Sequence, residues 1–150
     1  MASGWTDKGV FSMFDEFFRT TGAPTNMFVA LVTSATAPLK THNTLSELTE
    51  ITAGNGYTAG GFSLTRNSTD FDVLTEADPV ILQIKDVVWT ASGGPIPLSG
   101  GDARWAVLLD DNVTVGSREI YAWFDLVSDR SVSSGQTLTL VDCELQGDMP

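Results

Sequence analysis

The sequence is poor in the residues that most enzymes and metalloproteins use for chemistry. Its 150 residues include one cysteine, Cys143, and one histidine, His42. A single cysteine excludes a disulfide within the chain and a zinc site built from several cysteines, and we expect a buried, unreactive thiol because Cys143 follows an apolar run. A single histidine excludes a site with two histidine ligands, and the polar stretch 40–43 predicts a solvated loop around His42. We expect no bound metal or cofactor.

Basic residues are few as well. Eight lysines and arginines face 19 acidic residues, which gives a net charge of −11 and an isoelectric point of about 4.1. The basic residues are scattered and no two are adjacent, whereas binding to nucleic-acid phosphates needs clustered positive charge. The sequence therefore excludes direct contact with nucleic acid as the main role, and its acidity favours solubility.

Long hydrophobic runs are also missing. No window reaches about 18 apolar residues, the length that a membrane-spanning helix needs. The first eight residues are mostly polar and lack the apolar region of a secretion signal. We therefore expect a protein that is made in a cytoplasm, is not exported by the usual route and does not contact a membrane.

What the chain does contain is typical of a β-protein. Hydrophobic residues make up 42% of it and charged residues only 18%, and Thr, Ser and Gly take the place of the missing charges. The helix pattern comes first and the strands follow, which argues against a repeating βαβ fold. Apolar runs and alternating patterns predict strands at 27–32, 62–65, 71–74, 80–89, 104–109, 119–126 and 137–145.

These patterns predict one β-rich domain over 1–150, with a helical arm at 1–24 and a β-core at 25–150. The expected fold is mainly β: an antiparallel jelly roll or sandwich, or a small barrel, with one N-terminal amphipathic helix and a short second helix. The second helix is expected at 44–48 because Thr44 and Glu47 have the spacing of a capping box.

The N-terminal helix is expected at 8–20, capped by Thr6 or Asp7. Its apolar residues recur at spacings of three, four and seven, which places them on one stripe. Such a stripe either closes the open end of the β-core, which is its usual fate, or docks on a partner. The residues that would contact a partner from this helix are Phe11, Phe14, Phe17 and Phe18.

A glycine-rich segment at 54–61 adds one more candidate contact, Tyr57. A phosphate-binding loop would need a helix after the glycines and, in a Walker loop, a Gly-Lys-Ser/Thr ending. Both are absent, and an alternating strand pattern follows instead. We therefore interpret 54–61 as a turn that positions Tyr57 and leads into a strand.

No arrangement of residues predicts catalysis, so we expect a protein that is not an enzyme. No Gly-x-Ser-x-Gly elbow accompanies His42. Asp110 and Asp111 could bind Ca²⁺, but a hairpin turn is the simpler interpretation. The tryptophans could stack on a sugar, although those in strand patterns are expected in the core; the four are Trp5, Trp89, Trp105 and Trp123.

Six ordered sequence blocks resemble a family of small virion structural proteins of tailed bacteriophages. The resemblance covers roughly residues 26–142. The blocks are FVALVTSATAP at 28–38, LTEI at 48–51, GNGYTAGG at 54–61, VWTASGG at 88–94, RWAVL at 104–108 and SGQTLT at 134–139. No single block is diagnostic, but the ordered set is fairly specific, and the helix at 8–20 lies outside it.

The resemblance implies a capsid decoration, or cement, protein on the outer surface of the phage head. Its partners would be the major capsid protein and further copies of itself, as a homotrimer or another symmetric homo-oligomer. A neck or tail component shares the same β-rich profile and remains an alternative. A carbohydrate-binding module on the virion, using exposed tryptophans, is a second alternative.

Overall fold

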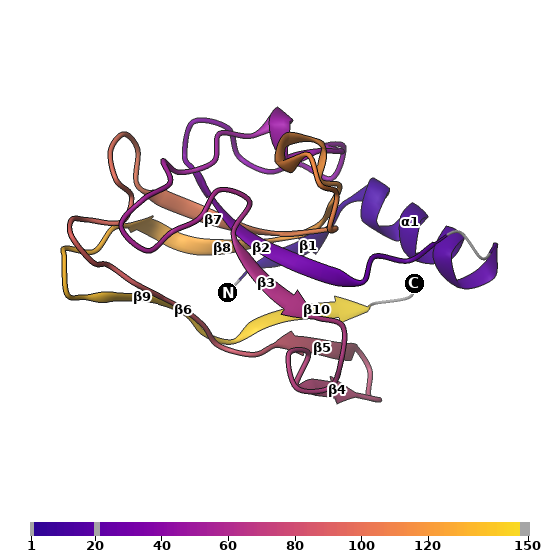
Figure 1. The fold of residues 1–150 in the computed structure, drawn as a ribbon. Coiled ribbons are helices and arrows are strands. Elements are labelled where there is room, and N and C mark those ends of the chain that lie inside the picture. The colour runs from indigo at the N-terminus through magenta and orange to yellow at the C-terminus, as the bar shows by residue number, and fades with distance from the viewer. Residues whose placement is uncertain (1, 20–21, 148–150) are drawn as a thin grey trace.

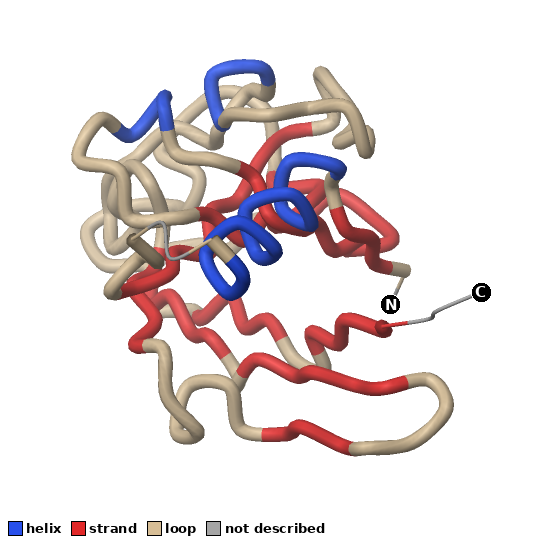
Figure 2. The backbone as a smooth tube through the Cα atoms, turned by 90° about the vertical axis from the view of Figure 1, so that its right-hand side faces the viewer, coloured by secondary structure: helices blue, strands red, loops and turns tan. Residues whose placement is uncertain are grey.

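The computed structural model describes residues 2–19 and 22–147. Its strands lie in two layers, with the N-terminal helix at one end of them (Figure 1). Figure 2 views the molecule from that end and shows the helix in front of the strands. The helix and the two short 3-10 turns are α1 (Asp7–Phe18), η1 (Leu45–Glu47) and η2 (Val115–Ser117).

The first layer is a five-stranded antiparallel sheet. The apolar run of β2 lies near its middle, pairing Phe28 with Ser63 on one side and with Leu109 on the other. Almost every residue of β2 is buried, as an apolar run without alternation predicts for a strand covered on both faces. In spatial order the strands are β1 (Ser3–Trp5), β8 (Ile120–Arg130), β7 (Ala103–Leu109), β2 (Asn26–Thr33) and β3 (Phe62–Thr65).

The second layer is a long antiparallel ribbon with one short strand at its edge. The ribbon pairs Ile84 with Cys143 before a break and Val87 with Leu140 after it, so the register is the same on both sides. At the break Asp142 adopts a left-handed conformation with φ of 52°. The strands of this layer are β4 (Val73–Thr75), β5 (Val80–Ile84), β6 (Val87–Thr90), β9 (Thr137–Leu140) and β10 (Cys143–Gly147).

The main hydrophobic core lies between the two layers. Met27, Val29 and Leu31 of β2 point into it and meet Ile84 and Val87 of the ribbon. A second, smaller core covers the other face of the five-stranded sheet beneath η1 and η2. Burial of each large aliphatic side chain contributes roughly 1.5–3 kcal/mol, so both faces of the sheet are fixed by packing.

The prediction of a mainly β fold with antiparallel sheets and one N-terminal helix is confirmed. The short second helix is present as η1, a 3-10 turn with the expected capping box between Thr44 and Glu47. Within the described residues neither layer closes into a barrel. No helix among these residues has the length and apolar character needed to cross a membrane.

Several predicted boundaries are wrong. Residues 80–89 and 137–145 each form two strands, because the ribbon breaks where Asp86 opposes Val141. The strand expected at 71–74 is displaced to β4. Strand β1 was not predicted, and it lies inside the segment expected to be only a helical arm, where it pairs with β8 at the edge of the sheet.

Candidate interaction surface

Helix α1 is attached to the end of β8 through small residues. Thr6 caps the helix: its hydroxyl accepts the N–H of Gly9 at 2.9 Å and donates to the carbonyl of Ile120. The backbone N–H of Thr6 also donates to Tyr121 at 2.9 Å. A Cβ atom added at Gly9 would overlap the backbone of Tyr121. Thr6 was one of the two predicted caps, and Gly9 is the residue that lets the helix approach the strand so closely.

A polar seam continues this attachment along the helix. Ser12 donates a hydrogen bond to the carboxylate of Glu119 at 2.9 Å, and the Lys8 ammonium lies 2.9 Å from the same carboxylate. The hydroxyl of Tyr121 donates to Glu16. Burial, followed by the hydrogen bond to Glu16, raises the pKa of Tyr121, so the hydroxyl keeps its proton and remains a donor. Helix α1 therefore contacts β8 through hydrogen bonds and close backbone packing rather than through its phenylalanines.

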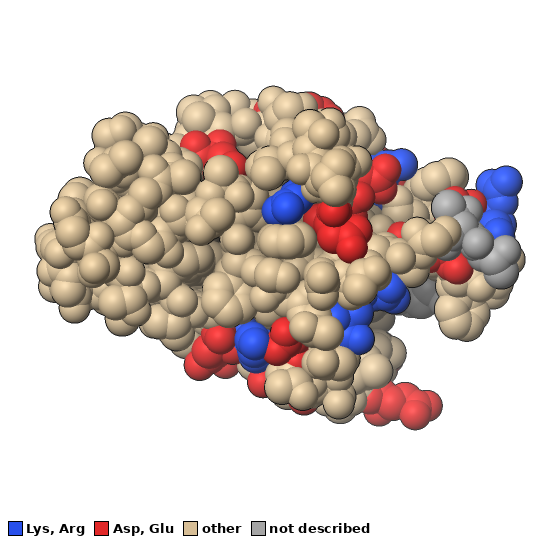
Figure 3. Space-filling view, viewed as in Figure 1, with Lys and Arg blue, Asp and Glu red and all other residues tan. Residues whose placement is uncertain are grey.

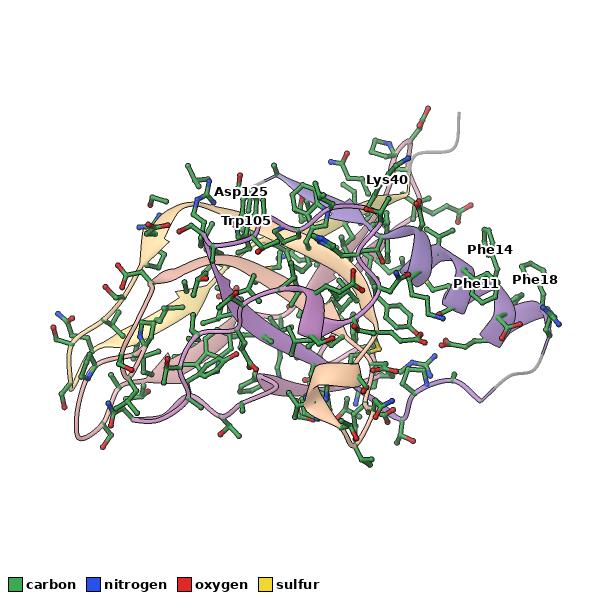
Figure 4. All side chains as sticks on the ribbon, turned by 90° about the horizontal axis from the view of Figure 1, so that it is seen from above. Phe11, Phe14, Phe18, Lys40, Trp105 and Asp125 are labelled. Atoms are coloured by element: carbon green, nitrogen blue, oxygen red, sulfur yellow. The ribbon has the colours of Figure 1, made fainter. Side chains whose placement is uncertain are left out.

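The phenylalanines of α1 point away from the body of the molecule. Phe17 and Phe18 are 79% and 73% exposed, and Phe11 and Phe14 are 56% and 58% exposed. Figure 4 shows three of these side chains along the side of α1 that faces away from the strands. Three of the rings contact one another, with centroids 4.9 Å apart for Phe17 and Phe18 and 6.2 Å apart for Phe14 and Phe18.

The favoured expectation that this stripe closes the end of the β-core is therefore wrong for the single chain. Met13 is the apolar helix residue that packs against the main core. We call the surface formed by Phe11, Phe14, Phe17 and Phe18 the aromatic face. The predicted end of the helix at residue 20 lies outside the described residues, and the last helical residue is Phe18.

An apolar groove lies on the opposite side of α1, between the helix and the ribbon. Its volume is about 440 Å³. Leu74 of the edge strand β4 forms part of its wall and is 73% exposed, so the groove is open to solvent there. The principal apolar residues of its wall are Trp5, Met13, Met27, Phe71, Leu74 and Leu82.

The charges around the aromatic face are largely paired within the chain. Lys8 pairs with Glu119, and Arg19 lies 3.4 Å from Asp15 one turn earlier on the helix. The Lys8 ammonium also lies 5.2 Å from the centre of the Phe11 ring, a cation–π distance. Figure 3 shows basic and acidic residues side by side at this end of the molecule. The aromatic face is thus an apolar surface bordered by both basic and acidic residues on a strongly acidic protein.

Tyr57, the fifth predicted contact residue, is inside the protein. It is 2% exposed, and its ring lies against Trp89 with 5.8 Å between centroids. Its hydroxyl accepts the N–H of Leu31 at 2.9 Å and donates to Glu50 at 2.7 Å. Burial raises the pKa of Tyr57 well above its usual range. Tyr57 therefore holds the glycine-rich turn against β2 and presents no surface to a partner.

The residues weighed for ion binding or catalysis have structural partners. The Asp111 carboxylate accepts the N–H groups of Thr25 and Asn26 at 2.8 and 3.2 Å. The Asp110 carboxylate accepts the N–H of Glu119 at 2.9 Å, and burial raises the pKa of Asp110. These contacts agree with the turn interpretation. Among residues 2–19 and 22–147, no group of acidic, histidine or cysteine side chains is arranged to hold a metal ion.

His42 and Cys143 also lie where packing and local hydrogen bonds account for them. The Nδ1 atom of His42 accepts the N–H of Leu39 at 3.0 Å within a turn. Cys143 is buried in the main core, and burial raises the pKa of its thiol to about 12. The prediction of a buried thiol is confirmed, and a thiol with this pKa is almost entirely protonated at neutral pH.

The tryptophans do not form one open platform. Trp89 is buried at 4% exposure in the main core. Trp105 and Trp123 pack edge to face on the other side of the sheet, with 5.9 Å between ring centres, and the Arg104 guanidinium lies 4.4 Å from the centre of the Trp105 ring. Arg104 in turn pairs with Asp125, close to Trp105 (Figure 4). The expected core role is confirmed for Trp89.

Analysis of the sequence identified the four phenylalanines but not the groove beside them. The groove combines residues from β1, α1, β2, β4 and β5, and long-range placement of this kind leaves no local pattern. One signal was available for the orientation of α1. Gly9, Ser12 and Glu16 recur at spacings of three and four, opposite the phenylalanines, which indicates a close-packed small face.

Comparison with known proteins adds no relative to this description: no protein-family model, no curated protein and no solved structure matches the chain.

Proposed function

We propose that the chain is a structural protein of a tailed-phage virion that decorates the outside of the head. In this role it binds the major capsid protein, stabilises the shell and performs no catalysis. The ordered blocks between residues 26 and 142 support the family. The single structural observation that supports a binding role is the aromatic face, which a rigid attachment to β8 holds away from the body.

The size of the aromatic face supports an assembly role. A phenylalanine buries roughly 150–250 Å² when it is fully covered, so four that are about two-thirds exposed leave roughly 500 Å² of apolar surface in contact with water. The largest apolar patch on a typical monomer has about this area and often has a function. A helix whose exposed side is this apolar is best explained by a protein partner.

The distribution of charge supports the same role. Segments 88–101 and 131–141 contain no charged residue, although the chain carries a net charge of −11. Figure 3 shows that the end of the molecule opposite α1 is free of charged residues in that view. Charged residues are depleted in the centres of protein interfaces because their desolvation is costly. The uncharged loops are therefore suited to contact a capsid surface, while the acidic remainder suits a location away from packaged DNA.

The proposal also includes a more specific type of β fold. A sandwich of the jelly-roll type is compatible with two antiparallel layers around a central core. Such a body is rigid and carries many loops, which suits a protein that bridges several capsid subunits.

The test is the copy number and location of the chain in purified particles. Quantitative mass spectrometry of virions should give one copy for every few major capsid subunits, and electron microscopy of the heads should show added density on the outer surface. A single small ring at the head–tail junction would contradict decoration and favour the neck or tail alternative. Absence of the chain from particles would overturn the proposal.

A further inference from the structure

We propose that a second copy of this chain covers the aromatic face: α1 of one copy inserts its phenylalanines into the apolar groove beside α1 of the next. The inference deepens the proposed function, because it names the partner of the aromatic face. Its argument rests on surfaces of this chain alone and requires no capsid.

The exposed apolar area supports self-association. The aromatic face offers roughly 500 Å² of apolar surface, whereas a stable interface buries about 800 Å² on each partner. The groove supplies the acceptor side of such a contact, since its wall is mainly apolar and continues onto Leu74 and Val73 at the exposed edge of β4. The polar residues that border the aromatic face add to the area buried on the donor side, as the polar rim of an interface does. A contact that uses the aromatic face of one copy and the groove of another buries both exposed apolar surfaces at once.

The size and lining of the groove are suited to the phenylalanine side chains. A groove of about 440 Å³ lies in the size range of pockets that enclose small ligands, and it can take phenyl rings. Two methionines, Met13 and Met27, line it and can adapt to the shape of an inserted ring. Arg66 also lines the groove, and its guanidinium can stack on an inserted phenyl ring.

The distribution of charge also supports contact at the aromatic face. Two molecules that each carry a net charge of −11 repel one another over most of their surfaces. At the aromatic face this repulsion is reduced, because Lys8 and Arg19 offset Glu119 and Asp15 there. The face and its border therefore form a place where an acidic copy can approach another acidic copy.

The direction of assembly follows from the helix. Around the helix axis Phe14, Phe18 and Phe11 lie roughly 100°, 140° and 160° from the groove-lining Met13. Phe17 lies roughly 40° from Met13, so the aromatic face is centred on a different side of α1 from the groove but reaches toward it at Phe17. Each copy therefore offers a donor surface and a separate acceptor surface. Contacts of this kind are head-to-tail; they form a ring where the rotation between copies closes and an open filament where it does not.

The experiment measures the mass of the purified full-length chain by size-exclusion chromatography with light scattering, over a range of concentrations. We expect the wild-type mass to exceed 16.0 kDa and to rise with concentration. Phe14→Asp removes the donor surface and Leu74→Arg removes the acceptor surface. Both residues are exposed in the single chain, so both variants should fold, keep the wild-type melting temperature and elute as monomers.

Val113→Asp is the matched control. Val113 is 96% exposed and lies outside the aromatic face and the groove, so this variant adds the same charge as Phe14→Asp without touching either surface. It should associate as the wild type does. A control that also becomes monomeric would show that added charge alone prevents association, and it would overturn the assignment of the two surfaces.

A mixing experiment tests the head-to-tail geometry. Phe14→Asp keeps an intact groove and Leu74→Arg keeps an intact aromatic face, so an equimolar mixture should form one-to-one dimers and nothing larger. If Leu74→Arg alone still associates, the aromatic faces pack against each other and the groove assignment is wrong.

Different results would overturn self-association and the proposed function. A wild-type chain that stays monomeric at every concentration overturns self-association, whatever the location of the chain in particles. A chain that associates as described but is absent from virions overturns the proposed function and leaves the head-to-tail contact in place.

Discussion

The loops around η1 and η2 and helix α1 both lie against the five-stranded sheet, but different kinds of contact attach them to it. The loops around η1 and η2 insert apolar side chains such as Leu45 and Leu48 into a core that excludes water. Helix α1, which is richer in aromatic residues, instead meets β8 through Gly9, Ser12 and the cap residue Thr6. The difference teaches that the residues meeting the sheet, and not the total apolar content of a segment, decide which side chains remain exposed.

Leu45→Ala should have the largest effect, because it removes a side chain that is 3% exposed in the smaller core. We expect a loss of about 2–5 kcal/mol in the free energy of unfolding. Urea denaturation followed by tryptophan fluorescence measures it. A loss below about 1 kcal/mol would show that the loops around η1 are held no more firmly than α1.

Gly9→Val should come second, with a loss of about 3 kcal/mol, because the new side chain would overlap the backbone of Tyr121. The loss should be local. Hydrogen exchange at 7–18 should rise strongly, while exchange at 26–33 in β2 should stay slow. Uniform acceleration of exchange across the sheet would contradict the view that α1 is attached mainly at its seam with β8.

Tyr57→Phe should cost about 2 kcal/mol, because it leaves the N–H of Leu31 without its buried acceptor and removes a donor from the carboxylate of Glu50, which keeps the N–H of Gly60. Tyr121→Phe is the matched variant on the helix side, where a single hydrogen bond to the partly exposed Glu16 is lost. We expect about 1 kcal/mol for that variant. Thermal melts of the two variants, measured side by side, compare a loop anchor with a helix anchor, and equal losses would contradict the difference.

Glu50→Gln tests the loop anchor through pH. Burial is the main cause that raises the pKa of Glu50 above its ordinary value of 4.5. The folded state therefore binds more protons at Glu50 than the unfolded state does, so this residue lowers stability as pH rises above 4.5 through the raised pKa. Wild-type stability relative to Glu50→Gln should fall across that window and level off at higher pH. Melting temperatures of both chains measured from pH 4 to 8 check the sign, and a difference that is independent of pH would contradict it.

Phe17→Ala should have the smallest effect on stability, within about 0.5 kcal/mol, because the side chain is 79% exposed. Far-UV circular dichroism melts at low protein concentration measure it without a contribution from association. A loss near 3 kcal/mol would mean that the aromatic face packs inside its own chain.

The strands were predictable where a pattern was local and continuous. The run at 27–32 and the alternation at 62–65 became β2 and β3 almost unchanged. The break in the ribbon was not predicted, although Asp86 interrupts the apolar face of 80–89 and Asp142 follows Leu138 and Leu140 on one face of 137–145, because a single charged residue in an alternating pattern does not by itself mark the end of a strand. The break appears only where the two segments pair and Asp142 adopts a positive φ.

For a similar reason, the sequence predicts which residues form the candidate site but not which way they point. The exposed phenylalanines could be named from helical spacing, but their direction depends on a small face that matches the backbone of β8. Tyr57 was misplaced because a glycine-rich turn resembles an exposed loop in sequence. Its burial depends on Glu50 and Leu31, which bind its hydroxyl from elsewhere in the fold.

The attachment of α1 to β8 has a consequence for the order of folding. Thr6 and Tyr121, which form the seam, are 115 positions apart in the chain. Such distant contacts form late, because the loop between them must close first. During synthesis the helix therefore emerges long before the strand that supports it, and its phenylalanines have no fixed direction until β8 is in place. We expect this delay to act as a checkpoint: only a chain whose last third has folded presents the aromatic face rigidly, so incomplete chains are poor competitors for assembly.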